Sequence, residues 1–290
     1  MAWIPLVLLV AFFDSLIDVL AKRTLRHVNA YVVAWSLRAF ALCLLLPLLW
    51  QIGVPPLGNR FFLALLVGGG LNVATTVFYM KAIQASDLSV TMPMVTVTPL
   101  LLLITSPLLI GEFPTFLGFV GILFIVAGAY VINLREIRNG TLAPFRALLR
   151  ENGPRWMLMV AVLWSIAANF DKIGVQNSSP LFWAAAINGA LSLVLFPTVW
   201  REFQSLPVKG STIRTQLKYL ILIGLLGGVA IVAHMMAINM TLLAYVVALK
   251  RLGMLMSVGF GFLIFKEKGM KTRLAGAIIM LVGVFCIILS

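Results

Sequence analysis

Two adjacent cations lie inside one of the most apolar stretches of the chain. Lys250 and Arg251 occur near the middle of TLLAYVVALKRLGMLMSVGFGFLIF. A charged side chain at the centre of a bilayer costs about 2.5–3.5 kcal/mol on insertion scales, so it requires a partner or a function. A Lys beside an Arg suits a phosphate or a carboxylate. Two interpretations stay open: the pair binds an anionic ligand group, or it forms buried ion pairs with acids on another helix.

The candidate acids are Asp14 and Asp18, which are four residues apart in the first apolar stretch. Residues at this spacing share one face of a helix, and Lys22 extends the polar stripe by a further turn. One interpretation is a structural network that holds this helix to Arg38 or to the Lys250–Arg251 pair. The other is a proton or cation site, or a contact to a substrate amine.

Further polar residues lie in the apolar stretches around His234 and Tyr79. His234 stands alone in GGVAIVAHMMAIN, and a lone histidine there is consistent with simple packing. Tyr79 has Asn72 and Thr75 one or two turns before it on the same side of its helix. Asn72, Tyr79 and His234 are therefore candidate ligand-orienting residues. Lys81, Asp87, Asp171 and Lys172 lie near expected helix ends, where the alternatives are a solvated role and a gating role, and the solvated role is favoured.

Composition places these residues in a membrane protein. Of 290 residues, 62% are hydrophobic and 11% are charged, whereas soluble domains have about a quarter charged residues. A membrane-spanning helix needs about 20 apolar residues. Ten helices are expected, at 3–21, 31–50, 61–81, 87–110, 114–133, 156–175, 180–200, 217–239, 242–265 and 271–289. The first is read as a membrane helix rather than a cleaved signal peptide.

The two halves of the chain resemble each other. Adding 150 maps Lys22 onto Lys172, and adding 155 maps Glu112 onto Glu267 and Tyr79 onto His234. We therefore expect two five-helix repeats, at 1–135 and 156–290, joined by a connecting loop at 136–155. An odd number of helices per repeat inverts the second copy. Inverted repeats are a recurrent architecture of secondary transporters, whose substrates bind near the bilayer midplane.

Loop charges predict the orientation in the membrane. The net charge is +13, and most basic residues follow the odd-numbered helices. Because Lys and Arg are retained on the cytoplasmic side, we expect both termini outside and read the charge as no sign of nucleic-acid binding. The expected location is the cell inner (plasma) membrane. The basic loop residues include Lys22, Arg23, Arg26, Arg135, Arg138, Arg146, Arg150, Arg155, Arg201, Lys209, Arg214, Lys266, Lys268, Lys271 and Arg273.

Nothing in the sequence points to an enzyme. It has no metal-ligand spacing, no nucleophile with a base and no phosphate loop, so we expect no catalytic residue, cofactor or metal. Cys43 and Cys286 lie in apolar stretches and predict no disulfide. Pro93, Pro99 and Pro107 in the expected helix at 87–110 predict kinks, because proline removes a backbone hydrogen bond.

Two segments resemble the EamA repeats of the drug/metabolite transporter superfamily. They are SDLSVTMPMVTVTPLLLLITSPLLIGEFPTFLGFVGILFIVAGAYVI and LLAYVVALKRLGMLMSVGFGFLIFKEKGMKTRLAGAIIMLVGVFCII. The resemblance covers essentially the whole chain. It implies ten helices in inverted repeats, alternating access, and a cavity lined by the first, third, fourth, sixth, eighth and ninth helices. Members of this superfamily move amino acids, sugars, nucleotide precursors, cations or lipid-linked groups.

A finer likeness concerns ALKRLGMLMSV, which resembles the Lys-Arg pair that holds phosphate in the plastid triose-phosphate/phosphate translocators of the same superfamily. This likeness implies that Lys250 and Arg251 bind an anion. Those translocators also use a lysine in their fourth helix, and here that helix has no cation after Lys81. A carboxylate or a zwitterion is therefore favoured over phosphate.

The leading hypothesis is a secondary transporter of a small polar metabolite, anionic or zwitterionic, in a lipid bilayer, with a coupling proton or a counter-substrate as a further partner. Alternatives are a flippase for a lipid-linked sugar or phosphate, and a proton-driven exporter of cations bound by Asp14 and Asp18. A non-transporting membrane scaffold is the hypothesis from another class. Against the scaffold, the cations Arg38, Lys250 and Arg251 outnumber Asp14 and Asp18 on these helices.

Overall fold

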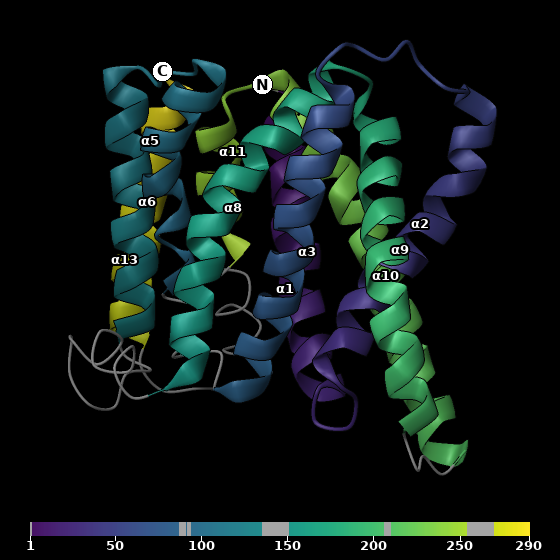
Figure 1. Ribbon diagram of the computed structural model, residues 1–290. Helices are drawn as coiled ribbons and strands as arrows, with labels where there is room; N and C mark the ends of the chain where they lie inside the picture. Colours follow the sequence, from purple (N-terminus) through teal and green to yellow (C-terminus); the bar gives the residue numbers. More distant parts are fainter. Residues whose placement is uncertain (1, 87–90, 92–93, 135–150, 206–209, 254–269) are drawn as a thin grey trace.

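The chain folds into a bundle of α-helices (Figure 1). The computed structural model describes residues 2–86, 91, 94–134, 151–205, 210–253 and 270–290. The helices in the first half are α1 Trp3–Thr24, α2 Ala30–Ile52, α3 Phe61–Ala85, α5 Thr98–Ile110 and α6 Phe116–Leu134. Those in the second half are α8 Asn152–Gln176, α9 Pro180–Ser205, α10 Gly210–Met240, α11 Leu243–Lys250 and α13 Met270–Ile288.

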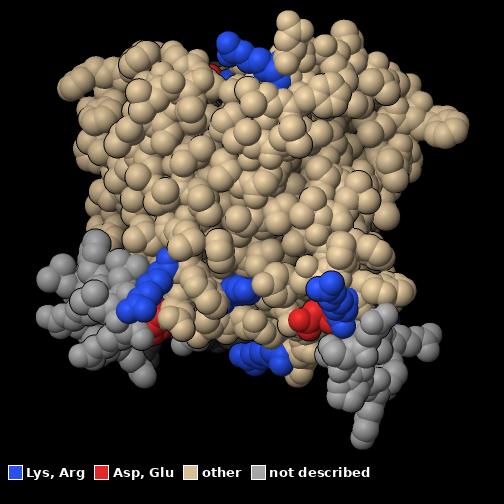
Figure 2. All heavy atoms as spheres, in the orientation of Figure 1, with Lys and Arg blue, Asp and Glu red and all other residues tan. Residues whose placement is uncertain are grey.

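Length and composition mark the bundle as a membrane protein. Among the described residues, 6 helices are long and apolar enough to cross a bilayer, and α5, α6 and α13 supply shorter apolar stretches. Large apolar side chains point outward, including Trp50 at 93% exposure and Leu66 at 77%. An exposed apolar surface of this extent is stable in lipid rather than in water. In the view of Figure 2, Lys and Arg gather at the two ends and leave the band between them uncharged.

Two of the expected helices are interrupted. Instead of one helix over 87–110, α5 begins at Thr98 after a turn at Thr96 and Val97. Instead of one helix over 242–265, α11 ends at Lys250 and is followed by a turn at Arg251 and Leu252. Pro99 explains the first break, because its ring removes the N–H that would continue the helix. Adding 155 maps Thr96 onto Arg251, so the two breaks are at matching positions of the repeats.

Two pairs of helices at matching positions of the two halves, α1 with α8 and α6 with α13, run in opposite directions. Lys22 near the end of α1 bonds to Ser86, whose hydroxyl lies 2.9 Å from Glu151 at the start of α8. Trp3 at the start of α1 and Thr241 line one pocket, and Lys172 near the end of α8 bonds to that Thr241. The helices α6 and α13 are also antiparallel, because an earlier residue of α6 lies near a later residue of α13. A Cβ on Gly121 would lie 2.7 Å from Gly283 O, and one on Gly128 would lie 2.6 Å from Gly276 O.

The helix packing is also matched between the halves. The first helix of the chain, α1, packs on α10 and α11, while α8, the first helix of the second half, packs on α3 and α5. The pairs α2–α9 and α6–α13 join helices at equivalent positions. Each half therefore buries its helices largely against the other half.

The bundle has two chemically different ends. We call the end with both termini, Gly58, Glu112 and Thr241 the terminal end, and it is uppermost in Figure 1. The opposite end, with Lys22, Arg23, Arg155 and Arg201, is the basic end. One hydrophobic cluster, including Val7, Trp183 and Leu243, lies toward the terminal end, and a second, including Ala21, Met80 and Met157, lies toward the basic end.

The close contact of α6 with α13 leads to a first prediction. Gly121→Ala should lower the unfolding temperature in detergent, because the new Cβ would lie 2.7 Å from Gly283 O and 2.8 Å from Ile287. Overpacking of this kind costs about 1–3 kcal/mol. Gly70→Ala on α3 is the matched control, since no atom lies within 4 Å of its new Cβ. Equal unfolding temperatures for the two variants would contradict this packing.

Candidate functional site

An ion pair joins the middle of α1 to the end of α11. Asp14 Oδ2 lies 2.9 Å from Lys250 Nζ. The ion-pair interpretation therefore holds for Lys250. The pair is not sealed, since 40% of the Asp14 side chain and 25% of the Lys250 side chain are exposed in the protein.

A second contact links α1 to α3 one turn further along. Tyr79 Oη donates to Asp18 Oδ1 at 2.6 Å. The Tyr79 ring also packs on Trp164 of α8, with 5.2 Å between the ring centres. Asp14 and Asp18 thus have different partners, a cation for the first and a phenol for the second.

Arg251 and His234 bring unpaired nitrogen atoms to the same region. Arg251 Nε and His234 Nδ1 are buried and have no hydrogen-bond partner within the described part of the chain. Arg251 forms no salt bridge with a described residue, although the charges of Asp14 and Asp18 act on it. A buried polar atom without a partner costs about 1–3 kcal/mol. Such atoms indicate a place where a ligand or water supplies the missing bonds.

The break after α11 sets the position of the two cations. The backbone N–H of Arg251 bonds to Ala248 O and that of Leu252 to Leu249 O, so the chain tightens into a turn. Interrupted helices whose free backbone groups face a site are a recurrent feature of transporter substrate sites. Here Lys250 closes the helix and Arg251 occupies the turn.

Asn72 belongs to a second polar cluster rather than to the one around Lys250. Its Nδ2 donates to both Asp171 oxygens at 3.3 Å, and Trp183 Nε1 donates to Asp171 Oδ1 at 3.1 Å. Thr76 Oγ1 donates to Asn72 O at 2.7 Å and accepts from Arg38 Nη2 at 2.7 Å. A hydrogen-bonded chain therefore runs from α2 through α3 to α8 and α9.

The solvated role expected for Asp171 is wrong, because this residue is 8% exposed. Its position near the end of α8 suggested contact with water, whereas α3 and α9 cover it. With Asp171 counted, three acids, Asp14, Asp18 and Asp171, match the three cations Arg38, Lys250 and Arg251. The excess of positive charge inferred from sequence is therefore removed.

Lys172 is likewise buried rather than solvated, and it closes the terminal end. Its Nζ pairs with Glu112 Oε1 and donates to Thr241 O at 2.7 Å. Glu112 Oε2 accepts from the backbone N–H of Leu243 at 2.9 Å, at the start of α11. Gly111 makes this possible by adopting φ 70° at the end of α5, a conformation that costs glycine little. We call Glu112, Lys172, Thr241 and Leu243 the terminal seal.

A matching lysine contact is found at the basic end. Lys22 Nζ donates to Ile83 O at 2.5 Å and to Ser86 O at 2.7 Å. Adding 150 maps Lys22 onto Lys172, and adding 155 maps Ser86 onto Thr241, so the two lysine contacts are at matching positions of the repeats. The partner expected from the repeat, Glu267, and the position Asp87 lie outside the described residues.

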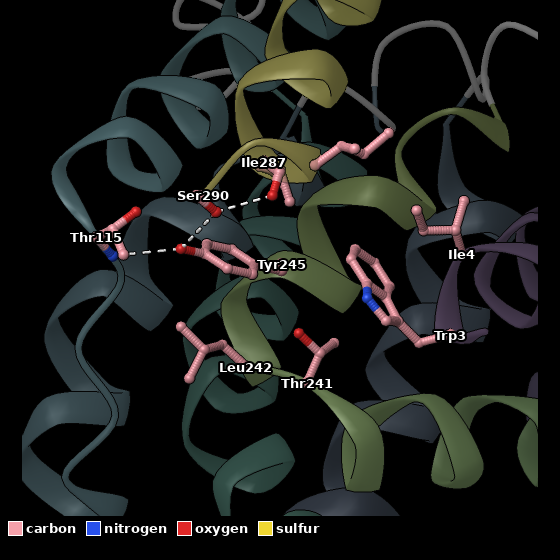
Figure 3. A pocket seen from close by; sticks show the side chains of 9 residues that line it. Trp3, Ile4, Thr115, Thr241, Leu242, Tyr245, Ile287 and Ser290 are labelled. Atoms are coloured by element: carbon pink, nitrogen blue, oxygen red, sulfur yellow. Dashed lines mark hydrogen bonds between the residues drawn. The ribbon is translucent and has the colours of Figure 1, made fainter. Parts of the chain in front are cut away.

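A pocket of about 340 Å³ opens beside the terminal seal (Figure 3). Tyr245 Oη accepts from Thr115 N at 3.3 Å, and Ser290 Oγ lies 3.2 Å from the same oxygen. Trp3, Ile4, Leu242 and Ile287 make the rest of the lining largely apolar. None of the site residues expected from sequence lines this pocket. The described residues also hold no group of three or more His, Cys, Asp or Glu side chains able to bind a metal ion.

The comparison with protein families decides the class of the chain. The EamA-like transporter family matches residues 1–134 and again residues 152–289. The chain belongs to the EamA-like transporter family. It is a multi-pass membrane protein of the drug/metabolite transporter superfamily, a group of transporters rather than enzymes. The resemblance stated from sequence is confirmed.

Comparison with solved structures supports the fold alone. A solved chain titled "Crystal structure of protein" matches this EamA-like chain with a TM-score of 0.73 and 14% sequence identity. The match covers 98% of this chain and 97% of the other. No curated protein matches the sequence significantly.

The ion pair between α1 and α11 leads to a double-mutant prediction. Asp14→Asn and Lys250→Met should each reduce the free energy of unfolding in mixed micelles, and together they should cost less than their sum. A coupling of about 0.5–3 kcal/mol is expected for residues in contact. The control pair is Asp14→Asn with Lys218→Met, since Lys218 is exposed on α10. Additive effects for Asp14 and Lys250 would show that the pair has no energetic role.

Proposed function

We propose that this EamA-like protein is a secondary transporter of a small polar metabolite that carries a carboxylate. A zwitterion is favoured, because its carboxylate and its amine match the cations and the acid of the site. Lys250 and Arg251 bind the negative group. Asp14 binds a substrate amine or returns to Lys250 when the site is empty. Tyr79 and His234 orient the substrate, and Asp18 holds the Tyr79 hydroxyl.

One observation carries this proposal: opposite charges meet at a helix break with unpaired nitrogen atoms beside them. Arg251 Nε and His234 Nδ1 are buried without partners among the described residues, and the Asp14–Lys250 pair is partly exposed. A scaffold would be expected to satisfy such groups internally, because unsatisfied polar groups in lipid are costly. A ligand with a carboxylate and an amine supplies both kinds of partner.

We further propose that the chain crosses the membrane ten times as two inverted repeats, at 1–135 and 156–290, with 136–155 connecting them. The opposite directions of α1 and α8, and of α6 and α13, support this arrangement. The matched packing of α1 on α10 and of α8 on α3 supports it as well. The basic end is assigned to the cytoplasm of a cell whose inner (plasma) membrane holds the protein, with both termini outside.

Transport then proceeds by alternating access between the two ends. The terminal seal closes one end through a buried ion pair and two backbone contacts. Lys22 makes the matching contacts at the basic end. Both sets of contacts are formed in this structure, as in an occluded state, and alternating access requires that each of them opens in turn.

The ligand assignment is tested by thermal shift with carboxylate, zwitterionic, phosphorylated and cationic metabolites. A compound that binds the folded state raises its unfolding temperature. A zwitterion or carboxylate should stabilise the wild type and leave the Lys250→Ala/Arg251→Ala double variant unshifted. The Lys218→Ala variant, altered at an exposed cation of α10, should respond like the wild type.

Other outcomes would assign other functions. If only cations stabilise the protein, and Asp14→Asn or Asp18→Asn abolishes the shift, the protein is an exporter of cationic compounds. If only lipid-linked sugars or phosphates bind, it is a flippase. A complete lack of response in the wild type, with transport also missing in proteoliposomes, would favour the scaffold.

The terminal seal gives a prediction for access from the terminal side. In a background with Cys43→Ser and Cys286→Ser, a reporter Val247→Cys on α11 should react slowly with a membrane-impermeant maleimide. Val247 is 7% exposed and lies between Leu243 of the seal and Lys250. Adding Glu112→Gln should speed labelling several-fold, because Lys172 loses its counter-charge and the closed state is weakened.

Arg60→Gln provides the control for this experiment, since Arg60 is an exposed cation at the same end. It should leave the labelling rate unchanged. Equal acceleration by both changes, or none by Glu112→Gln, would show that the ion pair does not control access.

A further inference from the structure

At the centre of the second polar cluster is Asp171, a buried acid that forms no hydrogen bond or ion pair with Asp14, Lys250 or Arg251. Two neutral donors, the Asn72 amide at 3.3 Å and the Trp183 indole at 3.1 Å, hold its carboxylate. Among the described residues no Lys or Arg nitrogen lies within 4.0 Å of it. The adjacent Lys172 is committed to the terminal seal. Neutral donors can hold a carboxyl group whether it is ionised or protonated.

The surrounding cations act on Asp171 from a distance. Arg38 is linked to Asp171 by a chain of hydrogen bonds through Thr76 and Asn72. The positive charge of Lys250 on α11 also acts on the Asp171 carboxylate. On the other helices packed against α8, Tyr79 of α3 is bound to Asp18, and His234 of α10 lies in the field of Lys250. Lys81 of α3 donates to Tyr31, and the charged residues of α9, Arg201 and Glu202, lie near its end. The α5 sequence has no titratable side chain. Asp171 is therefore a carboxylate in contact with neutral groups and in electrostatic contact with the substrate region.

The other repeat folds without an equivalent cluster. Adding 150 maps Ala21 onto Asp171 and Val33 onto Trp183, and adding 155 maps Asn72 onto Gly227. Ala21 and Val33 are fully buried apolar residues, and α1 packs on α10 as α8 packs on α3. The architecture thus does not require an acid at this position. An intramembrane acid that packing does not require is expected to have a function.

We propose that Asp171 is the binding site of a proton, separate from the Lys250–Arg251 site for the substrate. The proton comes from solvent, binds one carboxylate oxygen and returns to solvent, and no other bond changes. Protonation removes one of the three negative charges that balance Arg38, Lys250 and Arg251. The region then gains a net positive charge and attracts the carboxylate of a substrate. Proton and substrate therefore bind together, which is the linkage that symport requires.

This inference rests on the proposed function for its use in transport, but proton binding can be read without any substrate. The experiment is pH-difference infrared spectroscopy of the purified full-length protein, in which a protonated carboxyl gives a carbonyl band. The pH is varied over roughly 4 to 9, a range that includes the titration of buried carboxyl groups. The wild type should show a titrating carbonyl band that Asp171→Asn lacks and that both Asp14→Asn and Asp18→Asn retain, since Asp18 is the other carboxyl held by a neutral donor.

A second variant identifies the band if Asp171→Asn does not fold. Trp183→Phe keeps the ring in the groove left by Gly174, where a Cβ would lie 2.2 Å from the ring. It removes the indole donor to Asp171, so the band should change position. The control is Trp164→Phe, which alters a tryptophan packed on Tyr79 instead and should leave the band in place.

Three results would overturn the inference. The first is a wild type with no titrating carbonyl band, and the second is a set of titrating bands that is the same in Asp171→Asn as in the wild type. The third is loss of the wild-type band when sodium chloride replaces choline chloride at fixed pH, which would assign the carboxylate to a sodium ion. A negative metabolite screen with a band at Asp171 would contradict the substrate assignment and leave the proton site intact.

Discussion

The whole structure depends on the need to satisfy backbone polar groups where no water is available. Inside a bilayer a continuous helix meets this need within its own backbone, which is why the described elements are helices. Regular helices are interrupted at Thr96–Val97 and at Arg251–Leu252, where turns bond Val97 N to Met94 O and Arg251 N to Ala248 O. Such breaks are tolerated in membranes where the free groups face protein or a cavity. The second break is also where the cations Lys250 and Arg251 meet Asp14 and Asp18 from α1.

Packing between the halves makes these charges converge. Since α1 packs on α10 and α11 rather than mainly on its own half, Asp14 is brought to Lys250 across most of the sequence. The same exchange places α8 on α3 and brings Asp171 to Asn72. The two polar clusters thus lie at interfaces between the halves. A relative movement of the halves would change both clusters, and the terminal seal with them, which connects ligand binding to access in physical terms.

Much of the site could be anticipated from residue types. Lys250 and Arg251 in an apolar stretch, and Asp14 and Asp18 one turn apart, were recognisable because charges in lipid are costly. The partners were less predictable, since pairing Asp14 with Lys250 and Asp18 with Tyr79 depends on helix rotation and crossing. Asp171 and Lys172 were misjudged because distance from a helix end was used as a measure of exposure. Neighbouring α3 and the α10–α11 connection cover these positions, and no local pattern reports that cover.

Sequence alone determined the class of the protein, the approximate limits of most described helices, the duplication, and which polar residues lie within apolar stretches. These features follow from local properties: apolar length, charge cost and residue spacing. The tertiary structure decided which charges pair, where the ninth expected helix breaks, and that Asp171 has neutral donors instead of a cation. These depend on the relative placement of helices far apart in the chain. Packing and directional hydrogen bonds determine that placement, and neither is encoded in any short stretch of sequence.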